Sequence, residues 1–150
     1  MTPESRRIAG ILLVVLPTVM YGGVMLLTML IGDPRYMANP LRQNLWRAGH
    51  AHAGVLLVLS LVALRYVDEA QLGERLKIVA RSFIPSAAIL MPAGFFLSVI
   101  SPDADKPNAL IVLTYVGALV LATGVLVLGV GLLKRPSIAT STSASMRRDG

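Results

Sequence analysis

Two histidines in an apolar stretch are the residues of this chain best suited to chemistry. The segment Trp46-Arg47-Ala48-Gly49-His50-Ala51-His52-Ala53-Gly54 holds both histidines of the chain, with Arg47 three residues before His50. A neutral imidazole can ligate a metal or haem iron, and it can donate a hydrogen bond to a carbonyl. Arg47 adds a charge that suits phosphate or carboxylate. With Tyr115, these side chains are the candidate binding residues for a quinone carbonyl, a lipid phosphate or a haem propionate.

The spacing of the histidines limits the sites that they can form. Residues two apart on a helix point about 200° apart, so a regular helix cannot direct both imidazoles at one ion. The chain has no cysteine, and a zinc site would need carboxylates from Asp33, Asp103 or Asp105. We therefore expect no metal site, and the same geometry excludes a haem held by both histidines of one chain.

Three interpretations of the histidine segment stay open. In the first, the imidazoles hydrogen-bond neighbouring helices and Arg47 extends to phosphate, so the segment serves packing alone. In the second, it binds a quinone, a haem shared between protomers, or a haem with a methionine such as Met25 or Met29 as second ligand. In the third, it belongs to a proton or ion path, although no Asp, Glu, Lys or His continues such a path through the inner halves of the apolar runs.

Four apolar runs must position these side chains, at about residues 8–32, 48–67, 82–100 and 109–133. Each is about 20 residues or longer, the length that a helix needs to cross about 30 Å of hydrocarbon. Backbone amides find no partners in lipid, so such runs form helices. We expect one domain over residues 1–136, an all-α, four-helix transmembrane bundle with up-down connections, followed by a disordered cytoplasmic tail over residues 137–150.

The composition agrees with a membrane protein. The chain of 150 residues is 55% hydrophobic and its mean hydropathy is +0.69, which is too apolar for a soluble domain. The net charge of +6 lies in the connections and ends, where it meets headgroups rather than nucleic acid. No nucleotide loop or nucleophile elbow occurs, and we expect neither catalytic residues nor enzymatic activity.

The distribution of Lys and Arg predicts the orientation. Ten lie in the N-terminus, the second connection and the tail: Arg6, Arg7, Arg65, Arg75, Lys77, Arg81, Lys134, Arg135, Arg147 and Arg148. Four lie in the first and third connections: Arg35, Arg42, Arg47 and Lys106. The positive-inside rule therefore predicts that both termini are cytoplasmic.

Prolines and glycines predict local features of the helices. Pro17 and the pair Gly22-Gly23 indicate a kink or a close neighbour in the first helix. Pro85 is expected in the first turn of the third helix, where proline is tolerated. Glycines spaced seven apart in the fourth helix are expected to pack inside the bundle rather than to form a dimer seam; they are Gly117, Gly124 and Gly131.

Two connections also carry expectations. Pro34, Asn39 and Pro40 favour turns over a further helix in the first connection. The second connection, residues 67–81, mixes acidic and basic residues. We expect these charges to be solvated, rather than to form a surface helix broken at Gly73.

The motif Arg47-x-x-His50-Ala51-His52 resembles a segment at the start of the second helix in small bacterial four-span membrane proteins of uncharacterised function. Over one helix it is also similar to histidine-bearing helices in subunit I of haem–copper oxidases. The first resemblance implies a multi-pass protein of the bacterial plasma membrane. The second implies that His50 or His52 would hold any haem, but this chain lacks the further histidines that complete the oxidase sites.

Size and organisation favour a non-catalytic accessory or scaffolding component of a larger membrane assembly. Its expected partners are the lipid bilayer and a membrane protein complex or further copies of the chain, with no cofactor and no nucleic acid. The alternative is a haem- or quinone-binding redox protein that uses the His50/His52 end of the second helix. A small transporter is the third interpretation.

Overall fold

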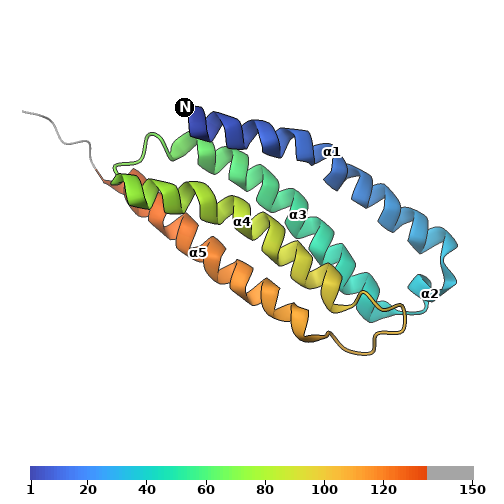
Figure 1. Cartoon of the computed structure of the whole chain (residues 1–150). Coiled ribbons are helices and arrows are strands. Elements are labelled where there is room, and N and C mark those ends of the chain that lie inside the picture. Colours follow the sequence, from blue (N-terminus) through green and yellow to red (C-terminus); the bar gives the residue numbers. More distant parts are fainter. Residues whose placement is uncertain (135–150) are drawn as a thin grey trace, which may run out of the picture.

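The structure is a computed structural model that describes residues 1–134 and contains four long helices (Figure 1). They are α1 (Pro3–Gly32), α3 (Pro40–Tyr66), α4 (Glu74–Ser98) and α5 (Val112–Leu133), with the short α2 (Pro34–Met37) and the 3-10 helix η1 (Ala109–Ile111) in the connections. No strand occurs in the part of the chain described. The predicted all-α, four-helix fold is confirmed.

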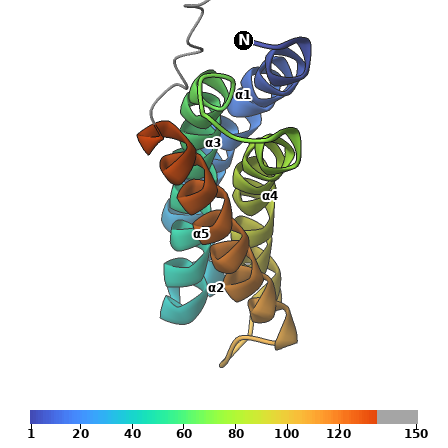
Figure 2. The ribbon, with the colours of Figure 1, turned by 90° about the vertical axis from the view of Figure 1, so that its left-hand side faces the viewer.

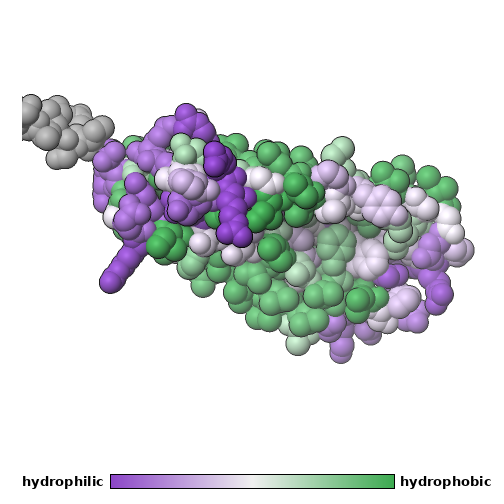
Figure 3. Space-filling model, turned by 45° about the horizontal axis from the view of Figure 1, so that its top comes forward, coloured by the Kyte–Doolittle hydropathy of each residue, from purple (hydrophilic) through white to green (hydrophobic). Residues whose placement is uncertain are grey.

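Four helical segments are long and apolar enough to cross a membrane: Pro3–Gly32, Pro40–Tyr66, Glu74–Ser98 and Ala109–Leu133. The surface on the face shown agrees, because hydrophobic side chains lie between two hydrophilic ends (Figure 3). The chain is therefore a multi-pass membrane protein. The start of α1 and the end of α5 lie at the same end of the bundle (Figure 1), whereas the cytoplasmic location of that end stays a prediction. The predicted disordered tail lies outside the described residues.

The helices α1, α3 and α4 begin before the apolar runs do, and polar side chains cap the first two of them. Asn39 caps α3 by accepting a hydrogen bond from the Arg42 N–H. The first connection, expected to hold turns alone, contains the helical turn α2, which Asp33 caps in the same way. The expectation for Pro85 is wrong, because α4 begins at Glu74 and places Pro85 in its interior.

The helices lie side by side in the order α1, α3, α4, α5 (Figures 1 and 2). α4 packs between α3 and α5, while α1 packs mainly against α3. The most apolar 18-residue window of α1 is 0% buried, compared with 33% for the corresponding windows of α3 and α4. The helix α1 is thus an edge element of the bundle.

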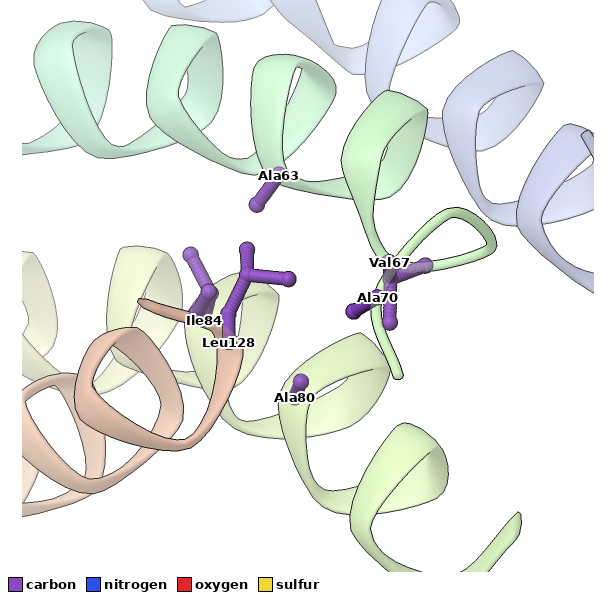
Figure 4. Packing of buried hydrophobic residues seen from close by; sticks show 6 residues of the cluster. All are labelled: Ala63, Val67, Ala70, Ala80, Ile84 and Leu128. Atoms are coloured by element: carbon purple, nitrogen blue, oxygen red, sulfur yellow. The ribbon is translucent and has the colours of Figure 1, made fainter. Parts of the chain in front are cut away.

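A buried hydrophobic cluster joins α3, α4 and α5 near the α3–α4 connection (Figure 4). It consists of Ala63, Val67, Ala70, Ala80, Ile84 and Leu128. Three of its six members are alanines, which allow the helix backbones to approach closely where lipid provides no hydrophobic driving force.

Glycines bring α5 onto α4. Gly117, Gly124 and Gly131 are all buried, and a Cβ atom added at Gly117 would lie 2.6 Å from Cγ of Met91. The prediction that this stripe packs inside the bundle is confirmed. Gly94 on α4 in turn contacts the backbone of α5, because a Cβ atom at Gly94 would lie 2.5 Å from the backbone nitrogen of Thr114.

Gly94→Ala should therefore destabilise the protein by about 1–3 kcal/mol, since the added methyl group meets backbone that cannot give way. Thermal unfolding in detergent measures the effect. Gly129→Ala is the matched control: apart from its own helix backbone and chain neighbours, no heavy atom lies within 4 Å of its added Cβ, so helix propensity should leave it unchanged or up to about 1 kcal/mol more stable. Equal loss in both variants would contradict close α4–α5 packing.

Candidate functional site

The imidazole of His50 packs against the glycine pair of α1. A Cβ atom added at Gly23 would lie 2.9 Å from Nε2 of His50, and one added at Gly22 would lie 3.6 Å from Nδ1. The absence of side chains at these positions gives the ring its place beside α1. The close neighbour predicted for Gly22-Gly23 is thus confirmed, and it is His50.

His52 points to another neighbour. Its ring centroid lies 5.0 Å from that of Phe95 on α4. Nδ1 of His52 is 2.7 Å from the carbonyl oxygen of Ala48; because a carbonyl only accepts, Nδ1 carries the proton. The two imidazoles therefore face different helices, as the two-residue spacing predicts.

The other two candidate residues form no hydrogen bond with either histidine among the described residues. Arg47 is exposed, and its Nη2 donates to Oε1 of Gln43. Tyr115 is 70% exposed on α5, which packs chiefly against α4. The binding roles of Arg47, His50, His52 and Tyr115 stay predictions.

A groove of about 510 Å³ runs along α1 and α3 and is bordered at one point by His50. Its lining is Leu16, Val19, Met20, His50, Ala51, Gly54, Val55 and Val58. His50 is the polar side chain in this apolar lining. Among residues 1–134, the histidine that forms a hydrogen bond is His52, whereas the nitrogens of His50 lie beside Gly22 and Gly23 of α1. Met20, rather than Met25 or Met29, borders the same groove.

This arrangement suits an elongated apolar molecule with a polar head. The aliphatic lining accommodates a hydrocarbon chain. A neutral imidazole donates to a carbonyl through one nitrogen and can ligate iron through the other. The groove is thus a candidate ligand site.

A polar network at the other end of the bundle escaped the sequence analysis. Oδ2 of Asp68 accepts from the Thr2 N–H at 2.6 Å, and Oδ1 accepts from Ser5 Oγ at 3.1 Å and from Arg81 Nη2 at 3.0 Å. Nε of Arg81 donates to Ser5 Oγ at 3.0 Å. We call these four residues the α1 clamp, because they attach the start of α1 to α4 and to the α3–α4 connection.

The clamp corrects the expectation that the charges of this connection are solvated for Asp68 and Arg81, whereas Glu69 and Glu74 are exposed as expected. The side chains of Arg81 and Asp68 are only 10% and 11% exposed. Burial raises the pKa of Asp68, but hydrogen bonds from the Thr2 N–H, Arg81, Ser5 and the Thr2 hydroxyl outweigh it and hold the pKa below its ordinary value. Local pattern could not reveal the network, since Ser5 and Asp68 are far apart in the chain.

Comparisons with protein-family models, curated proteins and solved structures found no match to this chain. The inferences below therefore depend on its own residues and geometry.

Asp68→Asn should destabilise the protein by about 3 kcal/mol near neutral pH, because Arg81 keeps its charge and loses its partner. The loss depends on pH in a defined direction. A depressed folded-state pKa stabilises the fold above the ordinary value of 3.8, and this contribution disappears as the pH falls through the folded-state pKa. The difference between wild type and Asp68→Asn should therefore shrink below about pH 3.8. Thermal unfolding in detergent across pH measures it.

Glu69→Gln provides the control for this experiment. Glu69 pairs with Arg65 on the surface, where both side chains are more than half exposed, so its loss should cost less than about 0.5 kcal/mol. Equal effects of the two substitutions would show that the α1 clamp does not stabilise the fold.

Proposed function

We propose that this multi-pass membrane protein is a non-catalytic accessory or scaffolding component of a larger membrane assembly. The proposal depends on the position and exposure of Tyr21 and on its hydroxyl group. Tyr21 lies near the middle of α1 and is 63% exposed, with no hydrogen bond from its hydroxyl to another residue of the described range 1–134.

A tyrosine hydroxyl at this depth needs an acceptor that lipid chains do not provide. Tyrosine usually lies at the membrane interface, where its hydroxyl reaches water. The other hydroxyls on the exposed part of α1 are satisfied internally: Thr18 donates to Val15 O, and Thr28 donates to Val24 O. Tyr21 has no such local partner, and a helix of another protein chain can provide one.

The edge position of α1 supports the same role. The α1 clamp fastens the helix at its start, and α2 follows its other end. Between these points its apolar window is unburied. A helix that is held at both ends but has one main neighbour can receive a partner helix with little rearrangement.

Mild-detergent extraction at native expression should yield this chain together with a stoichiometric membrane partner. Tyr21→Phe should reduce recovery of the partner about fivefold, because one interhelical hydrogen bond is lost. Quantitative mass spectrometry of the purified complex measures the ratio.

Tyr66→Phe is the control, because Tyr66 is an exposed tyrosine at the end of α3. It should leave the recovery of the partner unchanged. A solitary species from native membranes, or the same recovery with both variants, would refute the accessory role as argued from Tyr21.

A second candidate function is favoured by the groove: binding of a quinone or haem beside His50. Support comes from an apolar volume of about 510 Å³ with an imidazole on its border. In this role the chain of a lipid-soluble quinone would follow Leu16, Val19 and Val58, and its carbonyl would accept from His50. Transport stays a third prediction, and no contact among the described residues supports it.

Absorption spectra with and without dithionite, and quinone analysis of a solvent extract, test this function. If the groove is loaded, His50→Phe should abolish the Soret band or lower quinone content at least tenfold, since the polar contact and part of the space are lost. His52→Phe should retain the ligand, because His52 packs on α4 instead. A wild-type protein with neither signal would eliminate this candidate.

A further inference from the structure

A buried arginine without an acidic partner lies at the end of the bundle opposite the α1 clamp. Arg42, in the first turn of α3, is 8% exposed. Its guanidinium carbon lies 4.0 Å from the ring centroid of Trp46. Nη2 donates to the Ile100 carbonyl over a long 3.4 Å, and the buried Nε has no hydrogen-bond partner within the described chain.

No carboxylate of residues 1–134 compensates this charge. Every ion pair formed there uses Asp68, Glu69 or Glu74, which lie in or beside the α3–α4 connection. The Trp46 ring attracts the guanidinium through its π face, but a ring is a weak substitute for an anion. A buried cation without a counter-charge carries an uncompensated desolvation cost.

A second orphaned donor flanks the same tryptophan. Tyr36 is 1% exposed, and its buried hydroxyl has no hydrogen-bond partner among the described residues. Its ring centroid lies 5.9 Å from that of Trp46. Trp46 is held in turn by Phe96, whose carbonyl accepts from Nε1 at 3.2 Å and whose ring lies edge-on at 5.8 Å.

We propose that Arg42 and Tyr36 form a binding site for the phosphodiester group of a membrane phospholipid. The planar guanidinium fork matches phosphate geometry and leaves donors free for it. Phosphate oxygens would accept from Nε–H of Arg42 and from the hydroxyl of Tyr36, and would supply the missing negative charge. The position at the ends of the membrane-spanning helices, beside a tryptophan, is the level of lipid headgroups.

Access of a phosphate to the buried guanidinium requires that the Ile100 carbonyl gives way. Asn39 fastens the α4–α5 loop, because its Nδ2 donates to the carbonyls of Pro102 and Ala104, both at 3.0 Å. The bond from Arg42 to Ile100 in the same loop is the weak one at 3.4 Å. A phosphate oxygen can replace that carbonyl while Asn39 keeps the loop in place. The site is independent of both functions proposed above.

The test uses the full chain, delipidated in detergent and titrated with phosphatidylglycerol while thermal unfolding is followed. The wild type should gain in Tm on addition of the lipid. Arg42→Gln should need about tenfold more lipid for the same gain, because the charge-assisted bonds are lost. Arg35→Gln is the matched control: Arg35 is an exposed arginine on α2, at the same end of the bundle, so its response should equal that of the wild type.

Tyr36→Phe tests the proposed phosphate site even if Arg42→Gln does not fold. If the hydroxyl binds phosphate, this variant should need about threefold more lipid. If the site holds no ligand, removal of an orphaned buried hydroxyl leaves the lipid response unchanged, and that result overturns the proposal. Equal responses of Arg42→Gln and Arg35→Gln also overturn it. Inorganic phosphate alone should give no gain in Tm; a gain equal to that from the lipid would assign the site to a soluble anion and refute the phospholipid.

Discussion

Hydrocarbon accepts and donates no hydrogen bonds, and this constraint governs the structure of the chain. It requires each apolar run to satisfy its own backbone, and each run does so as a helix. It also governs polar side chains inside the spans. Ser60 and Thr123 donate to the carbonyls of Leu56 and Leu119, four residues earlier on their own helices. Polar groups that cannot be satisfied locally are therefore the most informative ones in this protein.

The two ends of the bundle differ in whether a buried charge has a partner of opposite charge. At one end Asp68 and Arg81 compensate each other, and Ser5 completes the network that holds α1 in place. At the other end Arg42 has an aromatic ring and a long bond to a carbonyl, without an anion. The first arrangement stabilises a connection within the chain. The second is incomplete within the chain and points to a group from the bilayer.

Several features of the fold could be predicted because they depend on local pattern. Helix number follows from run length, and the packing of Gly117, Gly124 and Gly131 follows from their spacing along one helix. The opposed directions of His50 and His52 follow from helical geometry. Helix starts were less predictable, since helices extend into the polar segments that precede their apolar runs. Pro85 lies inside α4 because that helix begins at Glu74.

Sequence alone determined that this is an all-α membrane protein, which side chains are polar enough to need partners, and that the two histidines diverge. These properties depend on composition and on the period of a helix. Only the tertiary structure decided the partners themselves: Ser5 meets Asp68, His50 meets Gly23, and Arg42 meets Ile100 rather than a carboxylate. Each of these contacts joins different parts of the chain, and its geometry is set by helix packing, which no local pattern encodes.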